Sequence, residues 1–306
     1  TNLSISATGV ATVAVSPGTA LGFQGTKVLP TYVTQTAAQT VPTSDPYYAA
    51  YGFDNTNYTE FRQITQTSDN ELQYWEFNNS AGNSYAAHFR DATNNQDAWF
   101  FGGTGATDET TAPAITGGAT VNYNGNYAGV ATTTGWVDAA AYATANGQWR
   151  MNGTAAMTAN FGTGQFIGRL TPEYWEKFEN QDFIQIDVPN NTVEVNQTGI
   201  RVNASAIDIQ AFHTATVELN GTINGNTFSG TSDVNTQTTN APGDTTNNRF
   251  VNGDRALQGG FFGNNAEAAT GVFSTYAIAP SPGGGDTGIN DDRRGTIDIQ
   301  GVFHGQ

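Results

Sequence analysis

The residues able to do acid–base or metal chemistry are few and scattered along the chain. Histidine occurs at His88, His213 and His304, and no two of them stand at the short spacings that metal-binding pairs use. Cysteine is absent, which excludes a thiol nucleophile, an iron–sulfur cluster and any disulfide. No serine-hydrolase or zinc-protease motif accompanies the histidines. The sequence therefore predicts a protein that is not an enzyme and has no metal centre.

The acidic residues give no catalytic pair either. The acids at 108–109 and at 291–292 are adjacent in sequence, and neighbouring side chains on an extended chain point in opposite directions. A glycan hydrolase that uses acids beside Trp175 remains the one enzymatic alternative. Among the histidines, the alternation of residue types predicts that His213 faces apolar surroundings and that His304 points outward.

A single acid, Glu267, stands in "GGFFGNNAEAATGVFSTY", residues 259–276, between two glycine- and aromatic-rich runs that are typical of strands. We expect its carboxylate to accept backbone N–H groups at the start of one short helical turn. The glycines let the backbone and aromatic rings pack closely, and Asn264 and Asn265 tolerate left-handed turn geometry. This motif is interpreted as structural.

The aromatic cluster "DPYYAAYGFDNTNYTEF", residues 45–61, is the strongest candidate for binding. Tyrosine side chains on a segment rich in Pro, Gly and Asn make rigid contacts at protein interfaces and in ligand pockets. The alternative is that these rings form the core of a small domain with few strands. The candidate binding residues are Tyr47, Tyr48, Tyr51 and Phe53.

Composition indicates an all-β protein. The 306 residues include 36 glycines, and only 37% are hydrophobic, which favours many short strands and turns over packed helices. The chain begins without Met and shows neither a signal peptide nor an apolar run that could span a bilayer, which indicates a processed, mature, soluble chain. The lack of cysteine suits an extracellular location, where free thiols oxidise.

The pattern of alternation divides the chain. Residues 1–101 cluster their aromatics irregularly, 102–117 form a linker rich in Gly, Thr and Pro, and 118–306 alternate regularly. Eight strands close a barrel without exposed edges. A helix is also expected over 171–181, since Thr171, Pro172 and Glu173 form a typical helix start. The predicted strands are Ala119–Tyr127, Trp149–Phe161, Gln165–Leu170, Thr214–Thr222, Thr227–Val234, Ala256–Gly263, Gly271–Ile278 and Thr296–His304.

The motif at 259–274, "GGFFGNNAEAATGVFS", resembles the signature of the β-barrel domain in transferrin-binding protein B and related surface proteins. The stretches "ATVNYNGNYAG" and "MTANFGTGQFIGRLT" are similar to that family's first barrel strand and next hairpin, and the linker resembles the segment with which such barrels begin. The resemblance covers roughly residues 98–306. Two features depart from the family pattern: the lipid-anchoring cysteine is missing, and the usual double lobe is reduced to one.

This resemblance implies an N-terminal handle-like β domain followed by an eight-stranded antiparallel barrel. It also implies a secreted or cell-surface protein of a Gram-negative bacterium, at the outer membrane, that captures a nutrient-bearing ligand or an extracellular protein without catalysis. The relatives include haem-scavenging and "solute-binding" proteins, so haem is a ligand that the resemblance allows. The alternative from another class is a structural or adhesive surface protein that assembles with copies of itself.

The charge of the chain excludes two classes of partner. Asp and Glu number 27 against 11 Lys and Arg, which gives a net charge of −16. Electrostatic attraction dominates binding to nucleic acids and anionic membranes, and here it has the wrong sign. We therefore predict no measurable affinity for DNA or for anionic vesicles at physiological salt. Salt-sensitive binding to either, measured by fluorescence anisotropy or vesicle sedimentation, would contradict this prediction.

Overall fold

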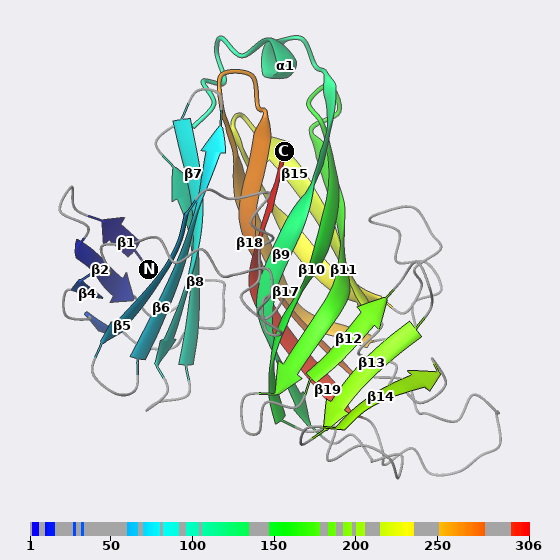
Figure 1. The fold of residues 1–306 in the computed structure, drawn as a ribbon. Helices are drawn as coiled ribbons and strands as arrows, with labels where there is room; N and C mark the ends of the chain where they lie inside the picture. The colour runs from blue at the N-terminus through cyan, green and yellow to red at the C-terminus, as the bar shows by residue number, and fades with distance from the viewer. Residues whose placement is uncertain are drawn as a thin grey trace.

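The structure, a computed structural model, consists almost entirely of antiparallel strands in three sheets (Figure 1). It describes residues 2–5, 10–15, 27–28, 32–33, 60–66, 70–79, 82–91, 96–103, 106–134, 147–177, 183–187, 192–197, 200–205, 215–235, 251–278 and 295–306. The single helix in these ranges, α1, is Pro113–Thr116.

The largest sheet closes on itself as an eight-stranded antiparallel barrel, as the sequence predicts. Around the wall the strands follow the order β9, β19, β18, β17, β16, β15, β11 and β10, and β10 pairs back onto β9. All eight predicted strands are present. Their bounds are β9 Thr120–Thr134, β10 Gly147–Asn160, β11 Gln165–Lys177, β15 Thr216–Asn224, β16 Thr227–Asn235, β17 Val251–Phe262, β18 Ala268–Ile278 and β19 Thr296–Gly305.

Alternation of side chains fills the barrel. On β10 the inward residues Trp149, Met151, Ala155, Met157 and Ala159 belong to one buried apolar cluster. At the end of the barrel that carries α1, called the capped end here, the interior is filled by aromatic rings, and the rings of Phe166 and Phe228 stack 3.9 Å apart. A barrel of eight strands has just enough room inside for such side chains.

The predicted helix over 171–181 is wrong for the residues described, because β11 continues as a strand to Lys177. Its pairing with β10 shifts register at Asn152 and Gly153, so that Glu173 is the extra residue of a β-bulge. A bulge tolerates Pro172, which has no N–H for a ladder. Burial of Trp175, which is fully inside the barrel, decides the conformation of this segment over its local helix signals.

A three-stranded extension leaves the barrel from the second half of β11. It comprises β12 Phe183–Asp187, β13 Thr192–Gln197 and β14 Ile200–Ser205, in that order. At this point β11 has left β15 and pairs with β12 instead. In the part of the chain that the structure describes, β14 is the outer edge of the sheet.

The N-terminal part forms two four-stranded sheets. The first consists of short strands, and the second packs against β17, β18 and β19 of the barrel (Figure 1). The strands are β1 Asn2–Ile5, β2 Val10–Val15, β3 Lys27–Val28, β4 Tyr32–Val33, β5 Glu60–Gln66, β6 Asn70–Asn79, β7 Gly82–Asp91 and β8 Gln96–Gly103. The β7–β8 side of the second sheet therefore covers part of the barrel wall.

The space inside the barrel yields a sharp test at two neighbouring glycines. A Cβ on Gly259 would lie 2.0 Å from the Phe228 ring, whereas a Cβ on Gly260 would have its nearest neighbour at 3.5 Å. We predict that Gly259→Ala lowers the free energy of unfolding by about 1–3 kcal/mol through overpacking. Urea denaturation measures the loss, and Gly260→Ala is the matched control, expected to stay close to the wild type. Equal effects of the two variants would contradict the packing described here.

Candidate functional site

The residues predicted to bind a partner lie outside the described residues. This holds for Tyr47, Tyr48, Tyr51 and Phe53, and also for His213 and for the acids at 291–292. Their assignment stays a prediction. The described residues offer four other places where polar or aromatic groups gather: the capped end, the two histidines at the sheet–barrel interface, a charged row on the outer wall, and the β16–β17 border.

The capped end is a structural closure, as the motif around Glu267 predicts. Glu267 Oε2 accepts the backbone N–H of Asn265 at 2.8 Å, and the Tyr123 hydroxyl donates to the carbonyl oxygen of Ala266 at 2.8 Å. The expected helical turn is instead a tight turn over 263–266. Its left-handed residues are Gly263 (φ 93°) and Ala266 (φ 58°), not the asparagines. The buried hydrogen bond of the Tyr123 phenol holds Ala266 in this unusual conformation.

The segment predicted as a linker lies across this end in its described part, residues 106–117. The Asn226 backbone N–H donates to the Glu109 carboxylate at 3.2 Å, and its side chain donates to the carbonyl oxygen of Thr107 at 2.9 Å. The Ala114 N–H donates to the Asn265 side chain at 2.6 Å. These contacts join the linker to the β15–β16 turn and to the β17–β18 turn.

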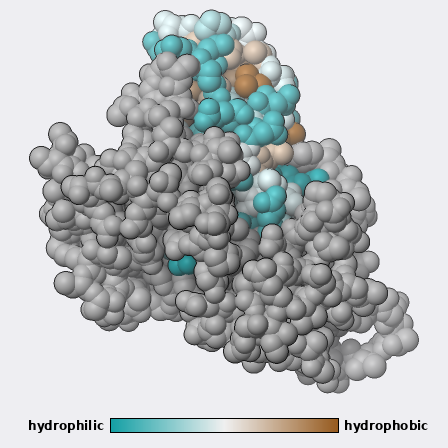
Figure 2. Space-filling view, in the orientation of Figure 1, coloured by the Kyte–Doolittle hydropathy of each residue, from teal (hydrophilic) through white to brown (hydrophobic). Residues whose placement is uncertain are grey.

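Acidic side chains contribute to the exposed surface of this end. Figure 2 shows it as largely hydrophilic with small hydrophobic spots, and the exposed residues include Asp108, Glu109 and Thr110. Hydrogen bonds from the Thr110 hydroxyl and N–H lower the pKa of the Asp108 carboxyl. The acids here bind their own backbone and neighbouring turns, as acids in loops commonly do.

His304 points outward from the barrel, as its place in the alternation predicts, but only 1% of this residue is exposed. Its strand face is the outer one, but β7 of the N-terminal sheet covers that face. The ring nitrogen Nδ1 lies 2.8 Å from the Thr270 hydroxyl, which in turn donates to the Ser84 hydroxyl of β7 at 3.3 Å. Gln306 reaches the other ring nitrogen at 3.2 Å. Burial lowers the pKa of His304 to about 3, so the ring is neutral at physiological pH.

The second described histidine, His88, is also buried at this interface. Its ring stacks on Trp99 with centroids 3.9 Å apart. Both histidines therefore act as packed polar groups between a sheet and a barrel. In the described ranges no group of three or more His, Asp or Glu side chains could hold a metal ion, and no helix is long and apolar enough to cross a membrane.

Trp175, the residue named in the hydrolase alternative, is fully buried. Its ring packs edge-on against Trp149 inside the barrel, with centroids 6.2 Å apart. It therefore offers no ring face on which a sugar could stack.

A row of four charged side chains crosses the outer wall. Arg169 lies opposite Glu218, and Glu218 lies opposite Asp233, on β11, β15 and β16. Two like charges directly opposite each other are destabilising. Each carboxylate has an arginine: Arg169 Nε lies 2.5 Å from Glu218, and Arg255 of β17 pairs with Asp233. The two acids and two arginines give the row no net charge. The row therefore links neighbouring strands through ion pairs and does not attract a cation.

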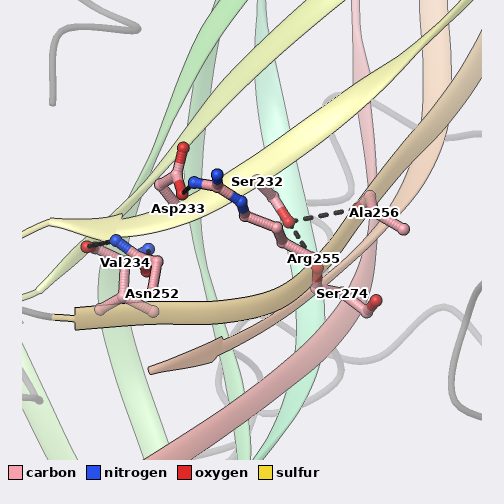
Figure 3. A network of polar contacts seen from close by, with 7 residues as sticks. All are labelled: Ser232, Asp233, Val234, Asn252, Arg255, Ala256 and Ser274. Atoms are coloured by element: carbon pink, nitrogen blue, oxygen red, sulfur yellow. Dashed lines mark hydrogen bonds and ion pairs between the residues drawn. The ribbon is translucent and has the colours of Figure 1, made fainter. Parts of the chain in front are cut away.

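The same region holds the polar network of Figure 3, where β16 and β17 meet through side chains. The Asn252 side chain accepts from the Val234 N–H at 2.8 Å and donates to the Val234 carbonyl oxygen at 3.2 Å. The Ser232 hydroxyl donates to the carbonyl oxygens of Ala256 at 3.2 Å and Ser274 at 2.6 Å. These contacts replace a backbone ladder along part of the barrel wall.

Two surface residues that lie beside this network were not predicted from the sequence. Tyr276 is the exposed large hydrophobic residue of the described chain, at 37%, and the Arg255 side chain is 42% exposed. The Tyr276 ring lies against Gly253, where an added Cβ would be 2.7 Å from it. Rigid, exposed Tyr and Arg are frequent anchors at protein interfaces. The alternation of β18 places Tyr276 on the outer face of the strand, and this pattern could have identified it as an exposed ring.

The fold and these contacts define an antiparallel barrel whose described polar groups serve structure and surface contact. The family model described as "C-lobe and N-lobe beta barrels of Tf-binding protein B" matches residues 116–306. This match covers more than half of the chain, so the chain belongs to that family. A search of the curated proteins finds no match.

A similar solved structure is a mutant of the vaccine antigen Transferrin Binding Protein B from Haemophilus parasuis. It shares 13% sequence identity with this chain at a TM-score of 0.39. The match covers 81% of this chain and 38% of the other, so this chain spans well under half the length of that relative.

The buried ring of His304 predicts an acid-sensitive interface. Its folded pKa of about 3 lies below the ordinary 6.5, so the unfolded chain binds more protons between these values and stability falls as the pH drops from 6.5 towards 3. At about pH 4 the loss is roughly 3 kcal/mol. Urea unfolding at pH 7 and pH 4 measures it, and His304→Gln, which does not titrate, should lose that much less. An equal loss in the variant would show that His304 does not titrate as described.

Proposed function

We propose that this chain is a non-enzymatic binding protein, located outside the cell or on the outer surface of a Gram-negative bacterium, that captures a nutrient-bearing protein or ligand. The observation that carries this proposal is the family match over residues 116–306 together with the closed barrel. The family takes its name from a protein that binds transferrin, an iron carrier. An iron-carrying or haem-carrying partner is therefore the first class to test.

The barrel supports such a role as a rigid frame. Its interior is packed with side chains, so the partner would contact loops and outer surfaces. The division into a handle-like domain at 1–101, a linker at 102–117 and a barrel at 118–306 is part of this proposal. Within it, Tyr47, Tyr48, Tyr51 and Phe53 of the handle are the contact residues, and Tyr276 with Arg255 offers a second contact on the barrel wall.

Self-assembly is the second candidate function, and one observation favours it. In the described part of the chain β14 pairs only with β13, which leaves it as the outer strand of the sheet. Outer strands present unpaired backbone groups that can join a strand of another molecule. This would make the chain a structural or adhesive surface protein.

Native mass spectrometry of the protein purified from its own host separates the two functions. Capture predicts a complex of one chain with a foreign protein or a small ligand of defined mass. Assembly predicts a series of multiples of the chain mass that grows with concentration. A chain that is always bare and monomeric would contradict both.

Replacing each candidate ring of the handle by alanine tests the location of the contact. At a true anchor, Tyr47→Ala, Tyr48→Ala, Tyr51→Ala or Phe53→Ala should weaken binding of the co-purifying partner by about 2 kcal/mol and leave the melting temperature nearly unchanged. At a core ring the same change should cost roughly 3 to 5 kcal/mol of stability. Calorimetry measures both quantities.

Phe166→Ala is the reference for a core ring, because the Phe166 side chain is fully buried inside the barrel. Large losses of stability with unchanged binding at all four handle positions would overturn the proposed contact.

A further inference from the structure

Side chains hold part of the β16–β17 border of the barrel wall. β16 pairs with β15 along its whole length, from Thr227 to Asn235. With β17 it pairs only from Thr227 to Gly230, opposite Gly260 to Leu257. Both strands continue beyond this point in the described chain, so β16 from Thr231 to Asn235 and β17 from Val251 to Ala256 run on without a shared ladder. We call this stretch the seam.

Side chains close the seam (Figure 3). The Asn252 side-chain amide forms hydrogen bonds with both the N–H and the carbonyl oxygen of Val234, as a peptide group of a neighbouring strand would. The Ser232 hydroxyl donates towards the carbonyl oxygens of Ala256 and Ser274, and Arg255 holds Asp233 from the outside. Each link therefore depends on one rotatable side chain in place of the chain backbone.

The β17 side of the seam is irregular. Its pairing with β18 shifts register between Asn252 and Arg255, so the strand bulges there. Gly253, inside the bulge, is exposed. The ion pair of Arg255 is partly open to solvent, where screening makes such pairs weak. Solvent thus reaches the links from the outer face.

Two other borders of the barrel, β18–β19 and β19–β9, are secured by continuous backbone pairing. The ladder between β18 and β19 runs from Ala269↔Gly305 to Ile278↔Thr296 without a shift. The ladder between β19 and β9 is equally unbroken. Local opening in a folded protein begins where few backbone bonds and few buried contacts must be broken.

We propose that the barrel opens at the seam, with the start of β17 separating from the end of β16 while the ladder from Thr227 to Gly230 and the rest of the wall stay closed. Opening brings the N–H and carbonyl of Val234 to solvent as a sheet edge. It also uncovers the Val234 side chain, which is fully buried in the closed barrel. The barrel thereby gains a second conformation at the end opposite α1.

Amide hydrogen exchange on the full chain, followed by NMR, tests this opening. The Val234 amide should exchange at least tenfold faster than the slowest amides of Thr227–Gly230, and its rate should not respond to low urea. Asn252→Ala should speed the Val234 exchange a further tenfold or more, because the acceptor of its N–H is gone.

Asn122→Ala is the matched control. Asn122 accepts a side-chain hydrogen bond from Thr158 at 2.8 Å on the outer wall, but there the backbone ladder is continuous. This variant should leave the exchange of its own strand pair unchanged. The proposal is overturned if the wild-type Val234 amide exchanges as slowly as the Thr227–Gly230 amides with the same urea dependence. That wild-type comparison decides the question even if Asn252→Ala does not fold.

Discussion

The ladder that joins the first and last strands of the barrel is the contact on which the rest of the structure depends. β9 and β19 pair from Thr134↔Thr296 to Gly125↔Gly305, across most of the barrel sequence. Without this ladder the sheet would be open, with two edges and an exposed apolar face. With this ladder, alternate side chains point into and out of the barrel, and the inward aromatic residues share one core.

Closure also explains why glycine and large rings occur together in the motif at 259–276. Inside a barrel of fixed width, each large ring needs a position without a side chain opposite it. Gly259 faces the Phe228 ring, and Gly271 lies against the Phe303 ring, where an added Cβ would be 2.6 Å away. The motif is typical of this packing, and its acid, Glu267, accepts a backbone hydrogen bond within a turn. For that reason it marks the fold and carries no information on the ligand.

The sequence predicted all eight barrel strands, because one buried face imposes a period of two on each of them. It failed at β11, where Thr171, Pro172 and Glu173 form a helix start in isolation but a bulge beside β10. At His304 the period correctly predicts the outer face of the strand, but it gives no sign of the second sheet that covers this face. The seam and the exposed Tyr276 depend on register between distant strands, which local patterns do not contain. The predicted handle residues remain a prediction.

The barrel wall is closed, but it has irregular places such as the seam between β16 and β17. The polar groups discussed above stabilise the capped end, the sheet–barrel interface and the outer wall, and we therefore propose that binding uses loops and outer surfaces. The most direct test of this account is the closing ladder itself, observed as amide–amide contacts by NMR on a deuterated sample. Contacts between Ala128 and Val302 and between Val130 and Gln300 are the predicted result. Contacts of β9 with β10 alone, and of β19 with β18 alone, would show an open sheet and contradict the account.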